Sequence, residues 1–430
     1  MSLRALGLPL SVALACSVIV SPVAHAAGFG IFEQGAKGMG MAGAFTAQAD
    51  DGSAMFHNVA GLGFIQEKRI DAGVTLIKLN ESTFDGLDPF PGEGTFGEQD
   101  VELQTPVHVY YVHPIGDRAT FGVGVFTPFG LATAWDDKDN WAGRFLNLRA
   151  ELKTFDINPS YAYRINDNFS VGVGLIARFA EVSLLRRGAA INPFTQTVFD
   201  AASVKLESDL DNGLGWNVGV LHRYNNSFAW GFSYRSKVKV DFSGDGRLTQ
   251  LSSGNQVLDA IVAGSLPFGR DLPIETSIEF PDMASLGVAL ALSANTLLEV
   301  DANWTGWSSF DTLTIDFIDT PALSSDLPQG YDDAYNYRIG FRWTAPSQSR
   351  WSLGYVYDES PQPDESVGPL LPDSDRNGFT VGYGRDKGAW GFDVALMYLD
   401  FKERTTTTNR DNFYGTYKTD AWLLGLTATF

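Results

Sequence analysis

Apolar and polar residues alternate along much of the chain with the period of a β-strand. Between residues 228 and 242 the even positions carry apolar side chains, apart from Ser236, and the odd positions carry small or charged ones up to Asp241. Successive side chains of a strand point to opposite faces, so this stretch has one greasy and one charged face. A soluble sandwich and a membrane barrel both use such strands. In a barrel we expect the greasy face to meet lipid and the charged face to line the lumen.

The same alternation recurs along the chain and predicts a barrel of fourteen strands. The stretches that carry it are 70–79, 106–112, 120–129, 151–163, 169–185, 214–222, 228–242, 272–292, 296–304, 335–343, 351–357, 379–383, 390–398 and 420–430. Splitting 272–292 at Pro281 would give fifteen. Because bacterial barrels have even strand numbers, we keep this stretch whole, with an irregularity at the proline.

The connecting segments alternate between long and short. Long ones fall near 80–105, 130–150, 186–213, 243–271, 305–334, 358–378 and 399–419, and each of the six remaining connections is short. Fourteen up-and-down strands with long outer loops and short periplasmic turns require this order, whereas a soluble sandwich does not. The last strand ends at Phe430, and a terminal aromatic residue there resembles the signal read by the barrel assembly machinery. We expect that machinery, outer-membrane lipid and lipopolysaccharide as partners.

The first 26 residues have the features of a signal peptide. Arg4 precedes a short apolar stretch broken by Pro9, and Ala24 and Ala26 occupy the positions that a signal peptidase reads. A lipoprotein signal at Cys16 is the alternative. Removing residues 1–26 also removes Cys16, the single cysteine, and one of the 31 basic residues, which leaves a net charge of −21. This charge disfavours nucleic acid as a partner.

After the signal peptide no stretch contains eighteen continuous apolar residues, which argues against membrane-spanning helices. Aromatic residues make up 13% of the chain, as alternating membrane strands would produce. Residues 27–68 lack alternation, and they are rich in glycine and in apolar residues such as Phe45 and Met55. A fourteen-stranded lumen is too wide for wall side chains to fill, so we interpret this segment as a plug rather than a solvated periplasmic tail. The expected organisation is a signal peptide at 1–26, a hatch at 27–68 and a barrel at 69–430.

Short motifs spread over the mature chain resemble the FadL/TodX family of outer-membrane long-chain fatty acid and hydrocarbon transporters. In order they are Ala27-Gly28-Phe29, Ala42-Gly43, Ala49-Asp50-Asp51, Asn58-Val59-Ala60-Gly61-Leu62, Phe129-Gly130-Leu131-Ala132-Thr133, Gly215-Trp216-Asn217, Tyr234-Arg235-Ser236, Trp304-Thr305-Gly306-Trp307-Ser308, Asp333-Ala334-Tyr335 and Asp358-Glu359-Ser360-Pro361. Singly these motifs are modest, and their shared order is specific. The resemblance implies an all-β, fourteen-stranded antiparallel transmembrane barrel closed by an N-terminal hatch.

The resemblance also implies roles for individual residues. Phe29 would line an internal pocket, and Arg186 would hold a ligand carboxylate. Gly130 would mark a kink in the third strand that opens the wall sideways. Asn58 and Ala60 belong to the hatch motif, where the family's usual proline is replaced by valine. An ordinary loop glycine and a routine strand-end arginine are the plain alternatives for Gly130 and Arg186.

Two long loops contain apolar residues with helix-like spacing, which we expect to form a first capture site for ligand or to pack on one another. They are Phe194 and Phe199 in one loop, and Leu258 and Ile261 in the other. The chain has no lysine or arginine between Asp301 and Tyr337, where a second base for a carboxylate might be expected, and this leaves room for an uncharged hydrocarbon.

Patterns that resemble enzyme or metal sites are incomplete. A glycine motif at 38–43 follows no strand, the calcium-like stretch that starts at Asp373 has Gly384 at its twelfth position, and the histidines lack zinc spacing. We therefore expect no cofactor, no metal and no enzyme activity, apart from loosely held divalent ions at acidic outer loops. The predicted function is uptake of hydrophobic molecules, most of all long-chain fatty acids. Hydrocarbon uptake, a barrel for adhesion or surface structure, and a hydrophilic porin are the alternatives.

Overall fold

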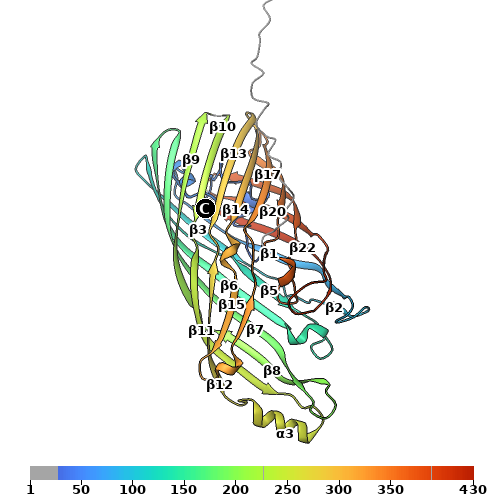
Figure 1. Cartoon of the computed structure of the whole chain (residues 1–430). Helices are drawn as coiled ribbons and strands as arrows, with labels where there is room; N and C mark the ends of the chain where they lie inside the picture. The colour runs from blue at the N-terminus through green and yellow to red at the C-terminus, as the bar shows by residue number, and fades with distance from the viewer. Residues whose placement is uncertain (1–27, 226, 389) are drawn as a thin grey trace, which may run out of the picture.

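The computed structural model describes residues 28–225, 227–388 and 390–430, and it is a closed antiparallel β-barrel (Figure 1). The first strand β1 pairs with the last strand β22 from Asp71↔Thr429 to Gly86↔Gly415, and this pairing closes the wall. Among the described residues, no helix is long and apolar enough to cross a membrane. The signal peptide expected at 1–26, with Cys16, lies outside the described residues.

The prediction of fourteen wall strands is confirmed, although several are interrupted and carry two labels. They are β1 (Arg69–Gly86), β3 (Val107–Ile115), β4 (Ala119–Phe126) with β5 (Gly130–Ala134), β6 (Arg149–Asn166), β7 (Phe169–Ile191), β8 (Val198–Ser208) with β9 (Asp211–Asn225), β10 (Phe228–Arg235) with β11 (Val238–Gln250), β12 (Asp271–Phe280) with β13 (Met283–Ser293), β14 (Thr296–Thr305) with β15 (Thr312–Phe317), β17 (Ala334–Thr344), β18 (Ser349–Asp358), β19 (Arg376–Lys387), β20 (Trp390–Phe401) and β22 (Gly415–Thr429). The expected irregularity at Pro281 is the break between β12 and β13.

Short elements complete the chain. In the loops lie the strands β2 (Phe96–Glu98), β16 (Ser325–Pro328) and β21 (Arg404–Thr406), the helix α3 (Gln256–Ser265) and the 3-10 turns η2 (Ala142–Phe145), η3 (Trp307–Ser309), η4 (Pro321–Leu323) and η5 (Asp364–Ser366). The N-terminal segment contains α1 (Ala36–Met39), α2 (Ala54–His57) and η1 (Val59–Phe64). In Figure 1, α3 lies beyond β8 and β12 at the lower end of the barrel.

The loop expected at 186–213 is largely β-structure. β7 continues to Ile191 and pairs with β8 from Ser183↔Glu207 to Ile191↔Val198. The prediction of helical structure around Phe194 and Phe199 is therefore wrong. Phe194 lies in the hairpin turn, and Phe199 lies in β8. Ladder hydrogen bonds between these strands stabilise the hairpin without requiring the regular apolar face that a membrane strand shows.

The greasy face predicted for 228–242 changes sides within the wall. In β10, Phe232 faces outward and is 39% exposed. Beyond the break at 236–237 the side chains reverse, so that Val240 and Phe242 are 0% and 2% exposed and face inward, while the outward Asp241 side chain is 74% exposed. The expectation that all even positions meet lipid is thus wrong for 238–242. A polar outer face and an apolar inner face suit a part of the barrel that stands in water and holds a hydrophobic interior.

The hatch lies inside the barrel, as predicted. The hatch in Figure 1, drawn in blue, lies toward the end of the barrel that carries the label β10. Phe32, Met55 and Phe56 of the hatch pack against Tyr110 and Phe126 of the wall. Apolar burial of this kind distinguishes a plug from a solvated tail.

Polar groups of the wall also hold the hatch. The backbone N–H groups of residues 45–47 donate to the β14 carboxylates Asp301, at 3.0 Å twice, and Glu299, at 2.6 Å. Arg235 and Arg338 donate to hatch carbonyl oxygens at 3.0 and 2.7 Å. These charged wall residues satisfy hatch backbone groups that would otherwise be buried without partners.

Candidate functional site

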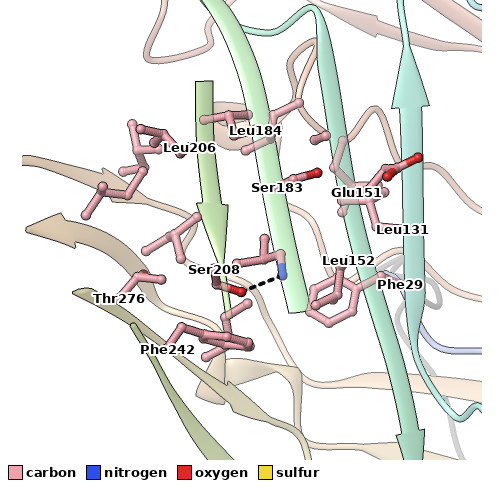
Figure 2. Close-up of a pocket in the computed structure, with 18 of the residues that line it drawn as sticks. Phe29, Leu131, Glu151, Leu152, Ser183, Leu184, Leu206, Ser208, Phe242 and Thr276 are labelled. Carbon is pink, nitrogen blue, oxygen red and sulfur yellow. Dashed lines mark hydrogen bonds between the residues drawn. The ribbon is translucent and has the colours of Figure 1, made fainter. Parts of the chain in front are cut away.

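An apolar cavity lies in the outer part of the barrel, among the inward faces of β5, β6, β7, β8, β11, β12 and β15 (Figure 2). We call this cavity of about 90 Å³ the outer pocket. Leu184, Leu206, Phe242 and Ile274 are among its lining residues, and so is Phe29 of the hatch. In Figure 2 the dashed line is the hydrogen bond from the Val182 backbone N–H to the Ser208 hydroxyl, at 2.9 Å, which ties two of its walls together.

Phe29 is the centre of a cluster of buried aromatic rings, which we call the aromatic gate. Its ring centroid lies 4.6 Å from Trp307, 5.2 Å from Phe310, 6.0 Å from Phe129 and 6.2 Å from Phe280, with edge-to-face geometry in each case. These are the distances and the geometry that aromatic pairs prefer. The gate thus joins the hatch, the third strand, β12 and η3 in one apolar contact.

The backbone around Phe29 is bonded to an interruption in the third strand. Residues 127–129 separate β4 from β5, and there the Ile31 N–H donates to the Pro128 carbonyl oxygen at 2.8 Å. The Gly130 N–H donates to the Phe29 carbonyl oxygen at 2.9 Å. Residues 29–31 of the hatch therefore replace part of the barrel's own strand pairing.

Gly130, predicted to mark a kink, is the first residue after this interruption. A Cβ added there would lie 3.0 Å from Cδ1 of Ile31 and 3.6 Å from the Leu152 carbonyl oxygen. Glycine at this position leaves room for the hatch to approach the strand. The break itself lies one to three residues earlier, where Thr154 on β6 donates its hydroxyl hydrogen to the Phe129 carbonyl oxygen at 2.6 Å.

A second and larger cavity, of about 560 Å³, lies beyond the aromatic gate, and we call it the lumen cavity. It shares Phe29, Leu131, Leu152 and Leu371 with the outer pocket. These four side chains therefore separate the two cavities.

The lumen cavity reaches through the barrel wall. It is lined by Leu152 and Thr154, which face inward on β6, and also by Lys153 and Phe155, which face outward on the same strand. Residues 104–107 and 130–133 form its two sides. One edge of β5 pairs with β6 along its whole length. At the opposite edge of β5, a hydrogen bond lies at the last residue of the strand, where the Asp100 N–H donates to the Ala134 carbonyl oxygen. The cavity therefore lies beside a stretch of β5 whose second edge has few hydrogen bonds to the wall among the described residues.

A buried charge network lies against the gate. Arg178 on β7 donates to both oxygens of Asp156 on β6, at 2.8 and 2.9 Å, and its guanidinium lies 4.5 Å from the Phe129 ring centroid and 4.8 Å from that of Phe280. Arg235 donates to the same carboxylate at 3.3 Å and to the hatch. Asp156 thereby links the gate aromatics to the hatch through two arginines.

Arg186 lies on β7, two positions beyond Leu184, in the stretch that pairs with β8. Its Nε is buried without a hydrogen-bond partner. Within the described residues no carboxylate oxygen lies within 4 Å of it, whereas the neighbouring Arg187 pairs with Asp139 at 2.6 Å. Arg186 does not line the outer pocket itself, whereas Leu184 on the same strand and its partner Leu206 do.

Asn58 and Ala60 hold the hatch rather than either cavity. The Asn58 amide donates to the carbonyl oxygens of Thr46, at 2.9 Å, and Val220, at 3.0 Å, and its side-chain oxygen accepts from the Ala60 N–H at 3.2 Å. Asn58 therefore caps η1 and ties it to β9, and this polar contact supports the hatch although the proline of the family motif is absent.

The loop residues expected to capture ligand are not brought together in one cavity. Phe194 is 71% exposed at the hairpin tip, and Ile261 is 46% exposed on α3, whereas Leu258 is buried at 5%. Neither cavity is lined by these three residues or by Phe199. The helix-like spacing of Leu258 and Ile261 is confirmed, since both residues lie in α3. Asn255 caps this helix, because its side-chain oxygen accepts a hydrogen bond from the Val257 N–H at 2.9 Å.

The carboxyl group of Asp373 anchors the start of the described hatch. It accepts from the Gly28 N–H at 3.2 Å and from the Ser360 hydroxyl at 3.0 Å, in a loop outside the wall strands. Burial raises the pKa of Asp373 to about 6, although nearby Arg376 opposes the shift. Asp373 also lines the lumen cavity.

Sequence reasoning missed Asp156, Arg178, Phe280 and the role of Trp307. Asp156 and Arg178 are cross-strand partners in register, so opposite charges at matching inward positions of neighbouring strands were available as a signal. Trp307 lies in η3 between β14 and β15, where no strand period applies, and no local pattern indicates that its ring turns into the lumen.

Comparisons with known proteins agree with this arrangement. A family model described as "Outer membrane protein transport protein (OMPP1/FadL/TodX)" matches residues 17–430. A long-chain fatty acid transport protein of Escherichia coli O6:H1 is 26% identical over 440 residues, which cover 96% of each chain.

Solved structures share the fold. A Pseudomonas aeruginosa FadL homologue matches with a TM-score of 0.80 and 23% identity, over 94% of this chain and 99% of that one. The Ralstonia pickettii toluene transporter TbuX matches with a TM-score of 0.68 and 17% identity, over 92% and 98%. At these identities the likeness is one of fold.

Proposed function

Because this chain belongs to the OMPP1/FadL/TodX family of outer-membrane transport proteins, we propose that it takes up long-chain fatty acids by passive diffusion through its plugged barrel. The chain is an outer-membrane transporter of hydrophobic compounds and not an enzyme. The similarity to the long-chain fatty acid transport protein of Escherichia coli favours fatty acids over other hydrophobic compounds as the ligand.

The observation that carries the proposal is the pair of cavities that meet at Phe29. The outer pocket is almost wholly apolar, and the lumen cavity shares lining residues with it and extends to residues 104–107 and 130–133, where we place the lateral opening. Ligand would bind in the outer pocket, pass the aromatic gate when Phe29 moves, and leave sideways between residues 104–107 and 130–133. A lateral exit keeps an apolar chain in contact with lipid rather than water.

Arg186 would hold the carboxylate of an incoming fatty acid while the tail enters the outer pocket. Its buried Nε without a partner is a donor that such a carboxylate could satisfy. The exposed side chains of Phe194, at the tip of the β7–β8 hairpin, and Ile261, on α3, would supply the first contact with the tail. Phe199 of β8 and the buried Leu258 of α3 would support this contact from behind.

Uptake of radiolabelled oleate and toluene by cells that lack their own transporter and express this chain tests the proposal. We expect oleate to enter and Arg186→Ala to slow oleate by about tenfold with toluene unchanged, since a hydrogen bond to a charged group contributes about 1.5–3 kcal/mol. Arg187→Ala is the matched control, because Arg187 is already paired with Asp139. Entry of toluene alone would support the hydrocarbon alternative.

A further inference from the structure

The lumen cavity is lined by four ionisable side chains, two acidic and two basic. They are Glu33 of the hatch, Lys153 of β6, Asp373 of the loop before β19, and Arg376 of β19. Their arrangement decides whether a charged ligand can cross this cavity.

Both cations already have carboxylate partners. Arg376 pairs with Asp358 at 2.8 Å, and Lys153 lies 3.5 Å from Glu151 and 3.4 Å from Glu181. The carboxylate in such a pair offsets the charge of its guanidinium or ammonium group and weakens the attraction of that group for a further carboxylate.

Both anions lack such partners. Glu33 accepts a hydrogen bond from the Phe32 N–H at 3.1 Å, and Asp373 accepts from the Gly28 N–H and the Ser360 hydroxyl. Within the described part of the chain, neither carboxylate has a lysine, arginine or histidine nitrogen within 4 Å. Glu33 is 9% and Asp373 4% exposed, so solvent screens them poorly.

The other charged groups around these carboxylates do not change the balance. Arg404 pairs with Asp364 at 2.8 Å, and Lys402 pairs with Asp375 at 2.8 Å. Arg338, which lies on β17 and donates to the hatch, has Asp301 as its cross-strand neighbour. Arg376, Lys153, Arg404 and Lys402 thus each have a carboxylate within 4 Å, whereas Arg338, among the described residues, has only the Asn336 amide oxygen and the Ala42 carbonyl oxygen as acceptors. Against this one unpaired cation, the two carboxylates of Glu33 and Asp373 remain in excess.

We propose that the lumen cavity passes its ligand in uncharged form, and that Glu33 and Asp373 determine this specificity by repelling an ionised carboxylate. The inference rests on the proposed function. A fatty acid that arrives ionised takes one proton from a hydronium ion before it passes the aromatic gate, so that a carboxyl O–H bond forms and water is left. After the acid leaves, this O–H bond breaks and the proton returns to water. Hydrocarbons pass without this step. Like charges brought together in a buried site reject a ligand that apolar contacts alone would accept.

The test measures uptake of labelled oleate and toluene at pH 6 and pH 8 by cells that express the full chain or its Glu33→Gln/Asp373→Asn variant. Amides keep the shape and can accept the same backbone hydrogen bonds, but they carry no charge. The matched control is Glu67→Gln/Asp85→Asn, which removes two exposed carboxylates. Toluene uptake reports any general damage to the path.

For the natural chain we expect oleate uptake, relative to toluene, to rise at least tenfold from pH 8 to pH 6, because above the pKa the neutral fraction of a carboxylic acid grows tenfold for each unit by which the pH falls. In the Glu33→Gln/Asp373→Asn variant the rise should be under threefold, with faster uptake at pH 8. Equal pH profiles in both proteins, with oleate uptake intact, would overturn this inference alone. Absence of oleate uptake by both proteins while toluene enters would instead overturn the proposed substrate and, with it, this inference.

Discussion

Replacing Asp156 by asparagine should loosen the hatch and the aromatic gate together. The Asp156 carboxylate is fully buried and accepts from Arg178 at 2.8 and 2.9 Å and from Arg235 at 3.3 Å. Removing its charge leaves two buried guanidinium groups without a counterion. Breaking a buried pair in this way costs about 3–5 kcal/mol.

The matched control is Asp241→Asn, which removes a carboxylate from an exposed pair with Lys239 on the outer surface. Exposed pairs of this kind contribute about 0–1 kcal/mol. Unfolding of the purified barrel in detergent with guanidinium, followed by tryptophan fluorescence, measures both variants. Ion conductance in planar bilayers measures the seal of the hatch, and we expect leakage with Asp156→Asn only.

A double variant separates charge from packing. Adding Arg178→Met to Asp156→Asn removes one of the two uncompensated cations, so the combined loss of stability should be smaller than the sum of the two single losses by about 1 kcal/mol or more. If Asp156→Asn unfolds at the same guanidinium concentration as Asp241→Asn and conducts no more ions, the reasoning about this network is refuted.

Three further variants follow from the geometry. Gly354→Leu should displace the hatch and raise ion leakage, because even a Cβ there would lie 2.4 Å from the Met41 carbonyl carbon; Gly264→Ala, which meets open space, should conduct like the natural chain. Leu152→Trp should slow uptake of oleate and toluene alike by about tenfold or more without raising leakage, since Leu152 lines both cavities where they meet. Burial raises the pKa of Asp373 to about 6 in the folded chain. The contribution of this group to the free energy of unfolding is therefore largest at low pH, and it falls by up to about 3 kcal/mol as the pH rises from about 4 to about 6. Guanidinium unfolding at several pH values should show a smaller fall for Asp373→Asn than for the natural chain.

The wall of the barrel could be predicted from the sequence because membrane strands must alternate. Lipid outside and a polar lumen impose a period of two on every membrane strand, and Phe228 to Tyr234 follow it. Beyond the membrane this constraint ends. The pattern from Val238 to Phe242 has the same period as before, yet its apolar side chains face inward, because a break at 236–237 reverses the faces without changing the alternation.

The candidate site could be predicted only in part. The apolar composition of the hatch indicated a plug, but the prediction that Phe29 lines a pocket came from the family resemblance, and no local pattern indicated its position against the third strand. The break at 127–129 depends on hydrogen bonds between the hatch and the strand, which are contacts between distant parts of the chain. The aromatic gate joins four separate segments, so no window of sequence contains it.

The central claim is that ligand passes from the outer pocket, past Phe29, to the lateral opening near Gly130. Crystals of the protein grown with a long-chain fatty acid brominated along its tail test this claim most directly, since anomalous scattering locates the bromine atoms. The account predicts bromine peaks in the outer pocket between Leu184 and Ile274, and in the lumen cavity on the other side of Phe29. Peaks between the hatch and β10 or β14, with both cavities free of bromine, would contradict it.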